Sequence, residues 1–363
     1  MRRLLLVLLT LLIARPLAAA PQDALVLPHG FSASVFASGL GKVRLLAVHP
    51  KTGVLFASVT DADEVIALPD ANHDGKADRV VVFASGIPKA HGLTWHDGFL
   101  YVAGTDRVVR VRDDNNDLVA DAKAQTVGKL PSGGGHFTRT IRFGPDGTAF
   151  ISIGSSCNVC LEENSERATI IAISADGKSR RIYASGLRNA VGITFDASGR
   201  LWATCNGRDL LGNELPPEPL YQVVDGGFYG WPYAYGNGIA DPTFGATRPD
   251  LVAKTLPPAW EFSAHIAPLG LNFYTGDKWP KEYQGDLFIA FHGSWNSTYK
   301  KGYKVMRVHF ANGQPVSASD FVTGFLQPDE KVWGRPVDII TGSDGQMYLT
   351  DDFGGRVFRV SHG

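Results

Sequence analysis

Histidines and arginines recur just before short apolar segments of this 363-residue chain. A histidine can accept a proton near neutral pH, and an arginine can pair bidentately with a carboxylate. The residues at these positions are Arg44, His91, His136 with Arg139, Arg188 with Asn189, His265, and Arg335. If the fold brings them together, they would bind an anionic ligand and supply a general base. The alternative is a solvated rim that holds no ligand.

The apolar segments follow one pattern six times: a short strand, a turn and a second short strand. In the stretch Gly133–Gly154, Pro145-Asp-Gly147 forms the turn of one such hairpin. The predicted hairpins cover residues 45–58, 92–103, 140–154, 192–204, 270–290 and 338–350, and they begin about 47 to 78 residues apart. Further strands such as Glu64–Leu68 follow several of the hairpins. The repeat predicts an all-β fold, a six-bladed β-propeller.

We expect this propeller to be a single domain over residues 21–363, with Ser34–Ala37 pairing with the last blade to close the ring. The innermost strands of a propeller surround a central channel, and their first residues open on one face. The chain after each second strand returns to that face, for example at Asn206-Gly-Arg-Asp209. The fold would therefore gather the polar residues at one rim. An array of β-sandwiches is the alternative architecture.

The composition indicates a globular protein, and the N-terminus indicates secretion. The chain is 44% hydrophobic with a formal net charge of −1, and it has no basic stripe, so nucleic acid is excluded as a partner. Residues 1–20 combine Arg2-Arg3, an apolar run and small residues up to Ala20, which predicts a cleaved signal peptide and a periplasmic protein. The apolar run is too short to span a bilayer, so the mature chain would have no membrane span. A retained N-terminal anchor is the alternative.

Three cysteines occur, and Cys157-Asn-Val-Cys160 can form a small disulfide in an oxidising compartment, which leaves Cys205 alone. Leu161 follows the pair where c-type haem attachment requires a histidine. A zinc site would usually need a second ligand pair at similar spacing, and the sequence offers none.

A different oxygen-rich pattern occurs at Asp70-Ala-Asn72-His-Asp74-Gly75-Lys-Ala-Asp78. Alternating oxygen ligands and a glycine at the turn are typical of a calcium loop, so Asp70, Asn72, Asp74 and Asp78 are candidate ligands of a structural calcium ion. Val81 occupies the position where such loops carry a bidentate glutamate. The segment Asp113–Asp121 repeats the spacing with Leu118 at the glycine position. The alternative for both is a turn in which the Asx side chains bond to the backbone.

Five motifs together resemble those of the soluble quinoprotein glucose/sorbosone dehydrogenases. They are Gly135-His136, Gly186-Leu-Arg-Asn189, Gly226-Gly-Phe-Tyr-Gly-Trp-Pro232, His265-Ile-Ala-Pro268 and Gly334-Arg335. The likeness runs from about Phe31 to the C-terminus, and the segments 157–169 and 291–296 are closer to the sorbosone dehydrogenase branch. The resemblance implies a six-bladed propeller that holds pyrroloquinoline quinone (PQQ) and Ca²⁺ and oxidises a sugar.

The resemblance also implies roles for individual residues. His136 matches the general base, Arg188 and Asn189 match cofactor contacts, and Arg335 matches a cofactor-binding arginine. Arg188 would also stabilise negative charge on the quinone oxygen. The backbone carbonyls of Gly207 and Arg208 match calcium ligands. By position alone, Arg44 would join the cofactor-binding arginines, and Trp260 and His265 would line the sugar side.

The sequence departs from this family at two positions. Val337 stands where the glucose enzymes carry a second arginine, and Ser294-Trp295 stands where they carry a lysine, so Lys300 or Lys301 would have to reach in. Both departures bear on tight quinone binding and on glucose as the substrate.

We therefore predict a PQQ- and calcium-dependent dehydrogenase that oxidises a sugar or an aldehyde and passes electrons to an acceptor that the sequence does not identify. Base-assisted hydride transfer to the quinone would be the reaction. One alternative is a calcium-dependent lactone hydrolase on the same scaffold, because a fold does not fix a function. The other is a non-catalytic propeller that serves as a binding module.

Overall fold

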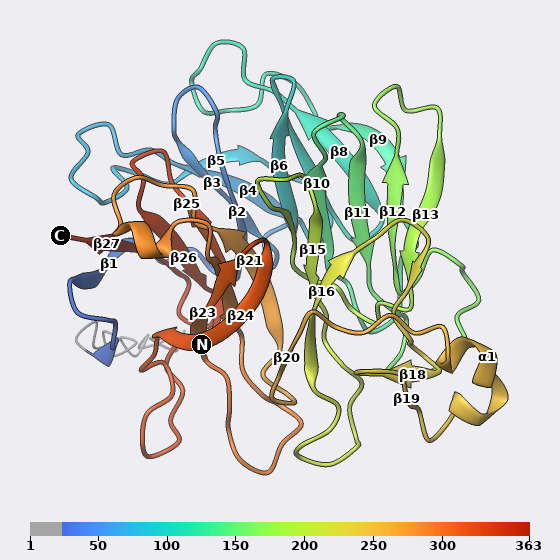
Figure 1. Ribbon diagram of the computed structural model, residues 1–363. Coiled ribbons are helices and arrows are strands. Elements are labelled where there is room, and N and C mark those ends of the chain that lie inside the picture. The colour runs from blue at the N-terminus through green and yellow to red at the C-terminus, as the bar shows by residue number, and fades with distance from the viewer. Residues whose placement is uncertain (1–23) are drawn as a thin grey trace, which may run out of the picture.

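The computed structural model describes residues 24–363, in which nearly all regular structure is β-strand (Figure 1). The predicted signal peptide, 1–20, lies outside the described residues. Six sheets, each built on four antiparallel strands, surround a common centre, which confirms the predicted six-bladed β-propeller. Within residues 24–363, no helix has the length and hydrophobicity that a membrane crossing requires.

In blades one to five the innermost strand comes first and chain order runs outward, whereas the outermost strand of blade six is the first strand of the chain. Blades one to three consist of β2 (Val43–Val48), β3 (Leu55–Val59), β4 (Glu64–Leu68) and β5 (Val81–Ala84); β6 (Gly92–His96), β7 (Phe99–Ala103), β8 (Arg107–Val111) and β9 (Gln125–Lys129); and β10 (Arg139–Phe143), β11 (Ala149–Ile153), β12 (Thr169–Ile173) and β13 (Arg180–Ser185). Blades four to six consist of β14 (Ile193–Phe195), β15 (Leu201–Thr204), β16 (Glu218–Val223) and β20 (Trp260–Phe262); β21 (Pro268–Phe273), β22 (Leu287–Phe291), β23 (Lys304–Ala311) and β24 (Gln314–Val322); and β25 (Pro336–Thr341), β26 (Met347–Asp351), β27 (Arg356–His362) and β1 (Phe31–Ser38).

The N-terminal strand closes the ring, as the sequence predicts. β1 pairs antiparallel with β27, so the first and last strands of the propeller belong to the same sheet. Closure of this kind joins the two ends of the chain in one blade and leaves each blade only a short outer edge.

One insertion departs from the simple repeat, and it accounts for the long step between the fourth and fifth hairpins. Between β16 and β20 the chain forms β17 (Gly227–Phe228), β18 (Ala234–Tyr235), β19 (Ile239–Ala240), the 3-10 turn η2 (Gly245–Thr247) and the short helix α1 (Pro249–Val252). A further 3-10 turn, η3 (Lys281–Tyr283), lies in the turn of the fifth hairpin. β17 pairs in parallel with β13, so the insertion extends blade three outward.

The local sequence explains the hairpins. Strands such as β12, Thr-Ile-Ile-Ala-Ile, are rich in β-branched residues that favour the pleated conformation. In the hairpin β10–β11, Gly147 has a φ of 79°, a left-handed conformation that a side chain would disfavour. Most hydrophobic side chains between neighbouring blades are buried, which holds the sheets face to face.

The centre of the ring contains an apolar cluster as well as polar groups. Leu45, Val191, Leu269 and Val337 come from four blades and pack together at the inner strands. Val337, the position of the missing second arginine, is fully buried in this cluster. The valine therefore fills the core of the ring and offers no donor to a ligand.

The two Asx-rich loops lie between third and fourth strands, at the end of the blades opposite the predicted rim. In the first loop, Asp70 accepts hydrogen bonds from the backbone N–H groups of Asp74 and Gly75, and Asp78 accepts one from Ala71. These bonds are those of an Asx turn, and calcium binding by Asp70, Asn72, Asp74 and Asp78 stays a prediction. Among residues 24–363, the only three His, Cys, Asp or Glu side chains with donor atoms all within 4.8 Å of one another are Cys157, Cys160 and Glu162.

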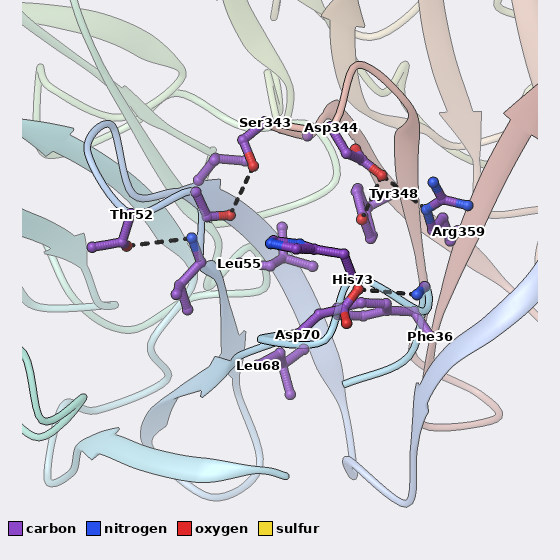
Figure 2. A pocket seen from close by; sticks show the side chains of 15 residues that line it. Phe36, Thr52, Leu55, Leu68, Asp70, His73, Ser343, Asp344, Tyr348 and Arg359 are labelled. Carbon is purple, nitrogen blue, oxygen red and sulfur yellow. Dashed lines mark hydrogen bonds and ion pairs between the residues drawn. The ribbon is translucent and has the colours of Figure 1, made fainter. Parts of the chain in front are cut away.

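Figure 2 shows a small pocket of about 110 Å³ at that opposite end, between blades one and six. Asp344 accepts hydrogen bonds from Tyr348 Oη and Arg359 Nε there, while Asp70 is bonded to its own loop. The hydrogen-bond partners of these polar groups are therefore within the protein. The predicted rim lies on the other face of the ring.

Candidate active site

Loops of blades three, four and five enclose a cavity of about 320 Å³ at the predicted rim. It is lined by Gly135, His136, Arg188, Asn189, Asn206, Gly207, Asp209, Glu218, His265, Ala267, Trp295 and Asn296. The structure thus brings together five residues that the sequence proposes for the site: His136, Arg188, Asn189, Gly207 and His265.

His136 lies in the loop before β10, and its hydrogen bonds define its tautomer. Nδ1 is 2.9 Å from the carbonyl oxygen of Ser155 and 2.9 Å from Ser155 Oγ. Ser155 Oγ donates to the carbonyl oxygen of Cys157, and a carbonyl oxygen can only accept, so Nδ1 carries the proton. Burial, assisted by the positive charge of Arg188, lowers the pKa of His136 to about 4. At neutral pH the ring is therefore neutral, with Nε2 as a basic nitrogen.

Arg188 is nearly buried, and all five of its N–H groups have acceptors in the protein. Nε donates to the Asn158 carbonyl, one terminal nitrogen to the carbonyls of Asn206 and Gly207, and the other to Asn158 Oδ1 and to Asp209. The ion pair with Asp209 measures 3.0 Å between nitrogen and oxygen. Burial lowers the pKa of Arg188 from its usual value. The side chain thus supplies a fixed positive charge to the cavity wall.

Oxygen atoms suited to a hard cation lie on the same wall. Asn206 and Gly207 line the cavity; the Gly207 carbonyl accepts from Arg188, and Asn206 Oδ1 is a buried acceptor without a hydrogen-bond partner in the described structure. Asp209 and Glu218 add carboxylates. Such a donor set fits Ca²⁺, which prefers carboxylate, amide and backbone oxygens.

The neighbouring Arg208 takes a different direction. Its side chain forms a 2.8 Å ion pair with Asp241, and the residue lines a separate, smaller pocket with Pro216 and Tyr221. Of the two predicted calcium ligands, only Gly207 therefore belongs to the cavity lining of the described structure.

Glu218 was not foreseen from the sequence. It is fully buried on β16, where Oε2 accepts the Gly207 N–H at 2.7 Å and Oε1 accepts the His265 N–H at 3.2 Å. Burial raises the pKa of Glu218 to about 7, against the effect of the Gly207 N–H. The carboxyl group connects the predicted calcium-binding backbone to the loop of His265. An alternating strand pattern gives no signal for it, since glutamate in a strand is ordinarily exposed.

His265 itself is held in place by its backbone and its ring. It has a φ of 64°, and its Nε2 lies 2.7 Å from the carbonyl oxygen of Gly212. Trp260, the other residue predicted for the sugar side, lies on β20, the outermost strand of blade four, and packs in the core with Phe262. The aromatic residue at the cavity is Trp295, whose side chain is 74% exposed. Its position in an irregular loop carries no periodic signal.

Arg44 and Arg335 form a second cluster outside the lining of the cavity described above. Arg44 pairs with Asp352 at 2.7 Å, and Asp352 also accepts from His292 Nε2 at 2.8 Å. Arg335 donates to the carbonyls of His292 and Gly293. Arg44 Nε is buried without a partner in the described structure, so this cluster retains a donor. Both arginines are on the predicted face, and the structure does not place them against His136.

The lysines considered as substitutes do not line the cavity within residues 24–363. Lys300 Nζ donates to the carbonyl of Glu330, and Lys301 Nζ donates to that of Asn213. The predicted disulfide between Cys157 and Cys160 is present, and Cys205 is the buried free cysteine.

Two curated proteins are similar to this chain in sequence. A curated protein from Borreliella burgdorferi, described as uncharacterized, is 33% identical over 297 residues, which are 78% of each chain. The PQQ-dependent pyranose dehydrogenase of Coprinopsis cinerea is 26% identical and aligns with 80% of this chain but only 48% of its own length. This chain therefore matches about half of that relative.

Solved structures share the fold. The holo PQQ domain of the Coprinopsis cinerea pyranose dehydrogenase has a TM-score of 0.78 at 22% identity, covering 93% of this chain and 97% of that domain. The PQQ-bound aldose sugar dehydrogenase of Streptomyces coelicolor has a TM-score of 0.68 at 20% identity, covering 93% and 99%. The resemblance to soluble PQQ-dependent sugar dehydrogenases is thus confirmed, and at these identities the structures show the propeller fold. The family described as "Domain of unknown function (DUF7133)" matches residues 48–357, and because this is most of the chain, the protein belongs to that family.

Proposed function

We propose that this protein is an oxidoreductase that oxidises a sugar or an aldehyde with bound PQQ and Ca²⁺. The observation that carries the proposal is a neutral histidine, His136, in a cavity that also contains the fixed charge of Arg188 and the oxygen donors of Asn206 and Gly207. The sequence relative and the solved structures named above, which are PQQ-dependent sugar dehydrogenases, support it.

The residues have separate roles in this proposal. His136 Nε2 accepts the proton of the substrate hydroxyl, while Ser155 keeps the ring in the required tautomer. Asn206 Oδ1 and the Gly207 carbonyl, with Asn189 beside them, would hold the calcium ion. Arg188 supplies positive charge at the cavity, and Arg44 and Arg335 supply it from the adjacent cluster. When bound, PQQ would take up the two electrons of the substrate as a hydride.

Reconstitution tests the proposal. The purified protein is mixed with PQQ and CaCl₂, and quinone binding is measured by absorbance before dye reduction is followed across a panel of aldoses and aldehydes. We expect binding and reduction that both depend on the two additions. If the protein shows no quinone binding and no dye reduction with any member of the panel, the proposed function is refuted.

The lactone hydrolase remains a second candidate because two carboxylates, Asp209 and Glu218, line the same cavity as the oxygen donors. A calcium ion held there could polarise a lactone carbonyl. The same protein preparation with CaCl₂ alone, tested on lactones, distinguishes the two: hydrolysis without added quinone favours the hydrolase.

The pH dependence follows from the pKa of His136. Since protonation removes the base, kcat/KM should stay level from pH 8 to about 5 and should fall at more acidic pH, near the pKa of about 4. A pH–rate profile of the reconstituted protein measures this. An acid limb centred near 6.5, the ordinary value for histidine, would contradict a buried base.

The same shift affects stability. The pKa of His136 in the folded protein is below the unfolded value, so the unfolded chain binds more protons between pH 6.5 and about 4. The contribution of His136 to the free energy of unfolding should therefore decrease as the pH falls through this range.

Trp295 is proposed as the substrate-side aromatic residue in place of Trp260. Trp295→Ala should raise KM about fivefold with little change in kcat, since an exposed ring that stacks on substrate contributes roughly 1 kcal/mol. Steady-state kinetics of the reconstituted enzyme check this. Trp260→Phe is the control, and its KM should equal that of the wild type. If Trp260→Phe raised KM and Trp295→Ala did not, the assignment would be reversed.

A further inference from the structure

One short loop, Cys157–Cys160, contacts the supports of both His136 and Arg188. On one side, Ser155 Oγ donates to the Cys157 carbonyl at 2.7 Å, and Ser155 is the residue to which His136 Nδ1 is bonded. On the other side, the backbone carbonyl and Oδ1 of Asn158 accept from Arg188 at 2.9 and 3.0 Å. The two principal polar side chains of the cavity therefore depend on four consecutive residues.

Asn158 connects this loop to three other segments. Its Oδ1 also accepts the backbone N–H of Asp209 at 2.7 Å, and its Nδ2 donates to the Asp209 carbonyl at 3.2 Å. Its backbone carbonyl accepts from Trp231 Nε1 at 3.2 Å. The amide side chain supplies an acceptor and a donor to Asp209 from two separate atoms. Asn158 thus links Arg188 to Asp209, the carboxylate that pairs with it.

The loop has no regular secondary structure, and its main constraint is the Cys157–Cys160 disulfide. Glu162 also restrains the loop, since its carboxylate accepts hydrogen bonds from the N–H and the hydroxyl of Ser156 at 2.6 and 2.7 Å. A covalent bond across four residues limits the conformations of the segment between them. Without it, Asn158 would have more freedom to leave its partners.

We propose that the disulfide-closed loop Cys157–Cys160 acts as a positioning element that orients Arg188, through Asn158, together with His136, through Ser155, and that reduction of the disulfide loosens both. The proposed orientation of Arg188 and His136 is inferred from the hydrogen bonds described above. Its consequence for turnover rests on the proposed function.

The reduction step is chemically simple. A dithiol reductant delivers two electrons and two protons, the Cys157–Cys160 sulfur–sulfur bond breaks, two thiols form, and the reductant becomes its cyclic disulfide. Both cysteines are half-buried and therefore within reach of a small reductant. Cys205 is fully buried, and burial raises the pKa of its thiol to about 12, so it should stay unreactive.

The test uses NMR on the cofactor-free protein, so that it does not depend on quinone binding. We measure the titration of His136 and the hydrogen exchange of the Arg188 Nε–H in three samples: oxidised wild type, wild type treated with dithiothreitol, and Cys157→Ser/Cys160→Ser. In the last two, His136 should titrate closer to 6.5 and the Arg188 Nε–H should exchange at least tenfold faster. His73, on the opposite face, should be unchanged.

Two Asn158 variants separate positioning from general damage. Asn158→Ala keeps the backbone carbonyl that accepts the Arg188 Nε–H but removes Oδ1, which holds residue 158 against Arg188 and Asp209, so exchange of the Nε–H should accelerate. Asn158→Asp keeps a side-chain acceptor and should restore slow exchange. Dithiothreitol should have no effect on the double serine variant. Identical His136 titration and Arg188 exchange in oxidised and reduced wild type would overturn the proposal.

The quinone provides an independent arm. If the wild type binds PQQ, the reduced protein should bind it about tenfold more weakly, and unchanged affinity would count against the proposal. If the wild type binds no quinone, the proposed function fails, while the NMR measurements still decide whether the loop positions the two side chains.

Discussion

His136→Asn should lower turnover of the reconstituted protein by about 10²- to 10⁴-fold, the range expected when a general base is removed. The asparagine amide nitrogen can occupy the position of Nδ1 and still donate to the Ser155 carbonyl, whereas nothing replaces Nε2. Because the change leaves Arg188 and the oxygen donors in place, quinone binding should stay within about threefold of the wild type. Single-turnover reduction of bound quinone by the substrate measures the effect.

His73→Asn is the matched control for this experiment. His73 is exposed on the opposite face and has a φ of 56°, a conformation that asparagine tolerates well. Its turnover should equal that of the wild type. Normal turnover in His136→Asn would remove this histidine from the mechanism.

Arg188→Met should lower the free energy of unfolding by about 3–5 kcal/mol and greatly weaken quinone binding. The change removes five hydrogen bonds and leaves the carboxylate of Asp209 without its ion-pair partner in a partly buried setting. Glu218, which the positive charge of Arg188 helps to keep ionised, should also become harder to ionise. Denaturant unfolding measures the first effect, and quinone titration measures the second.

Arg181→Met provides the contrast. Arg181 pairs with Asp225 on the surface, and both side chains are at least half exposed, so its loss should cost less than about 1 kcal/mol. Quinone binding should not change. If Arg188→Met and Arg181→Met lost the same free energy of unfolding, the buried hydrogen-bond network around Arg188 would contribute no more to stability than a surface ion pair.

The fold follows closely from the sequence because a propeller is built from local units. Each hairpin is specified by a run of β-branched and apolar residues and by a turn such as Pro145–Gly147, so the repeat itself indicates the blades. The closing pair β1–β27 is a long-range contact, yet it could be predicted because a ring must be closed by some strand. The insertion 224–259 was less predictable, since short strands and turns carry little periodic signal.

The site was predictable to the extent that it depends on position in the repeat. His136, Arg188, Asn189 and His265 precede innermost strands, and the structure brings them to one cavity. Trp260 lies on β20, outside the lining of this cavity, because position in the sequence alone does not reveal whether a strand is innermost or outermost in its blade. Arg44 and Arg335 were placed on the correct face, but their contacts with Asp352, His292 and Gly293 hold them in a separate cluster.

The sequence by itself determined the number of blades, the face that carries the polar loops and the identity of the histidine and arginine that meet there. These properties depend on short-range patterns and on the topology that they impose. Only the tertiary structure decided that Arg188 has all its N–H groups occupied, that Glu218 is buried beneath Gly207, and that Asn158 connects the disulfide loop to the cavity. Those features depend on burial and on hydrogen bonds between residues far apart in the sequence, such as Asn158 with Asp209 and Asn158 with Trp231, which no local pattern records.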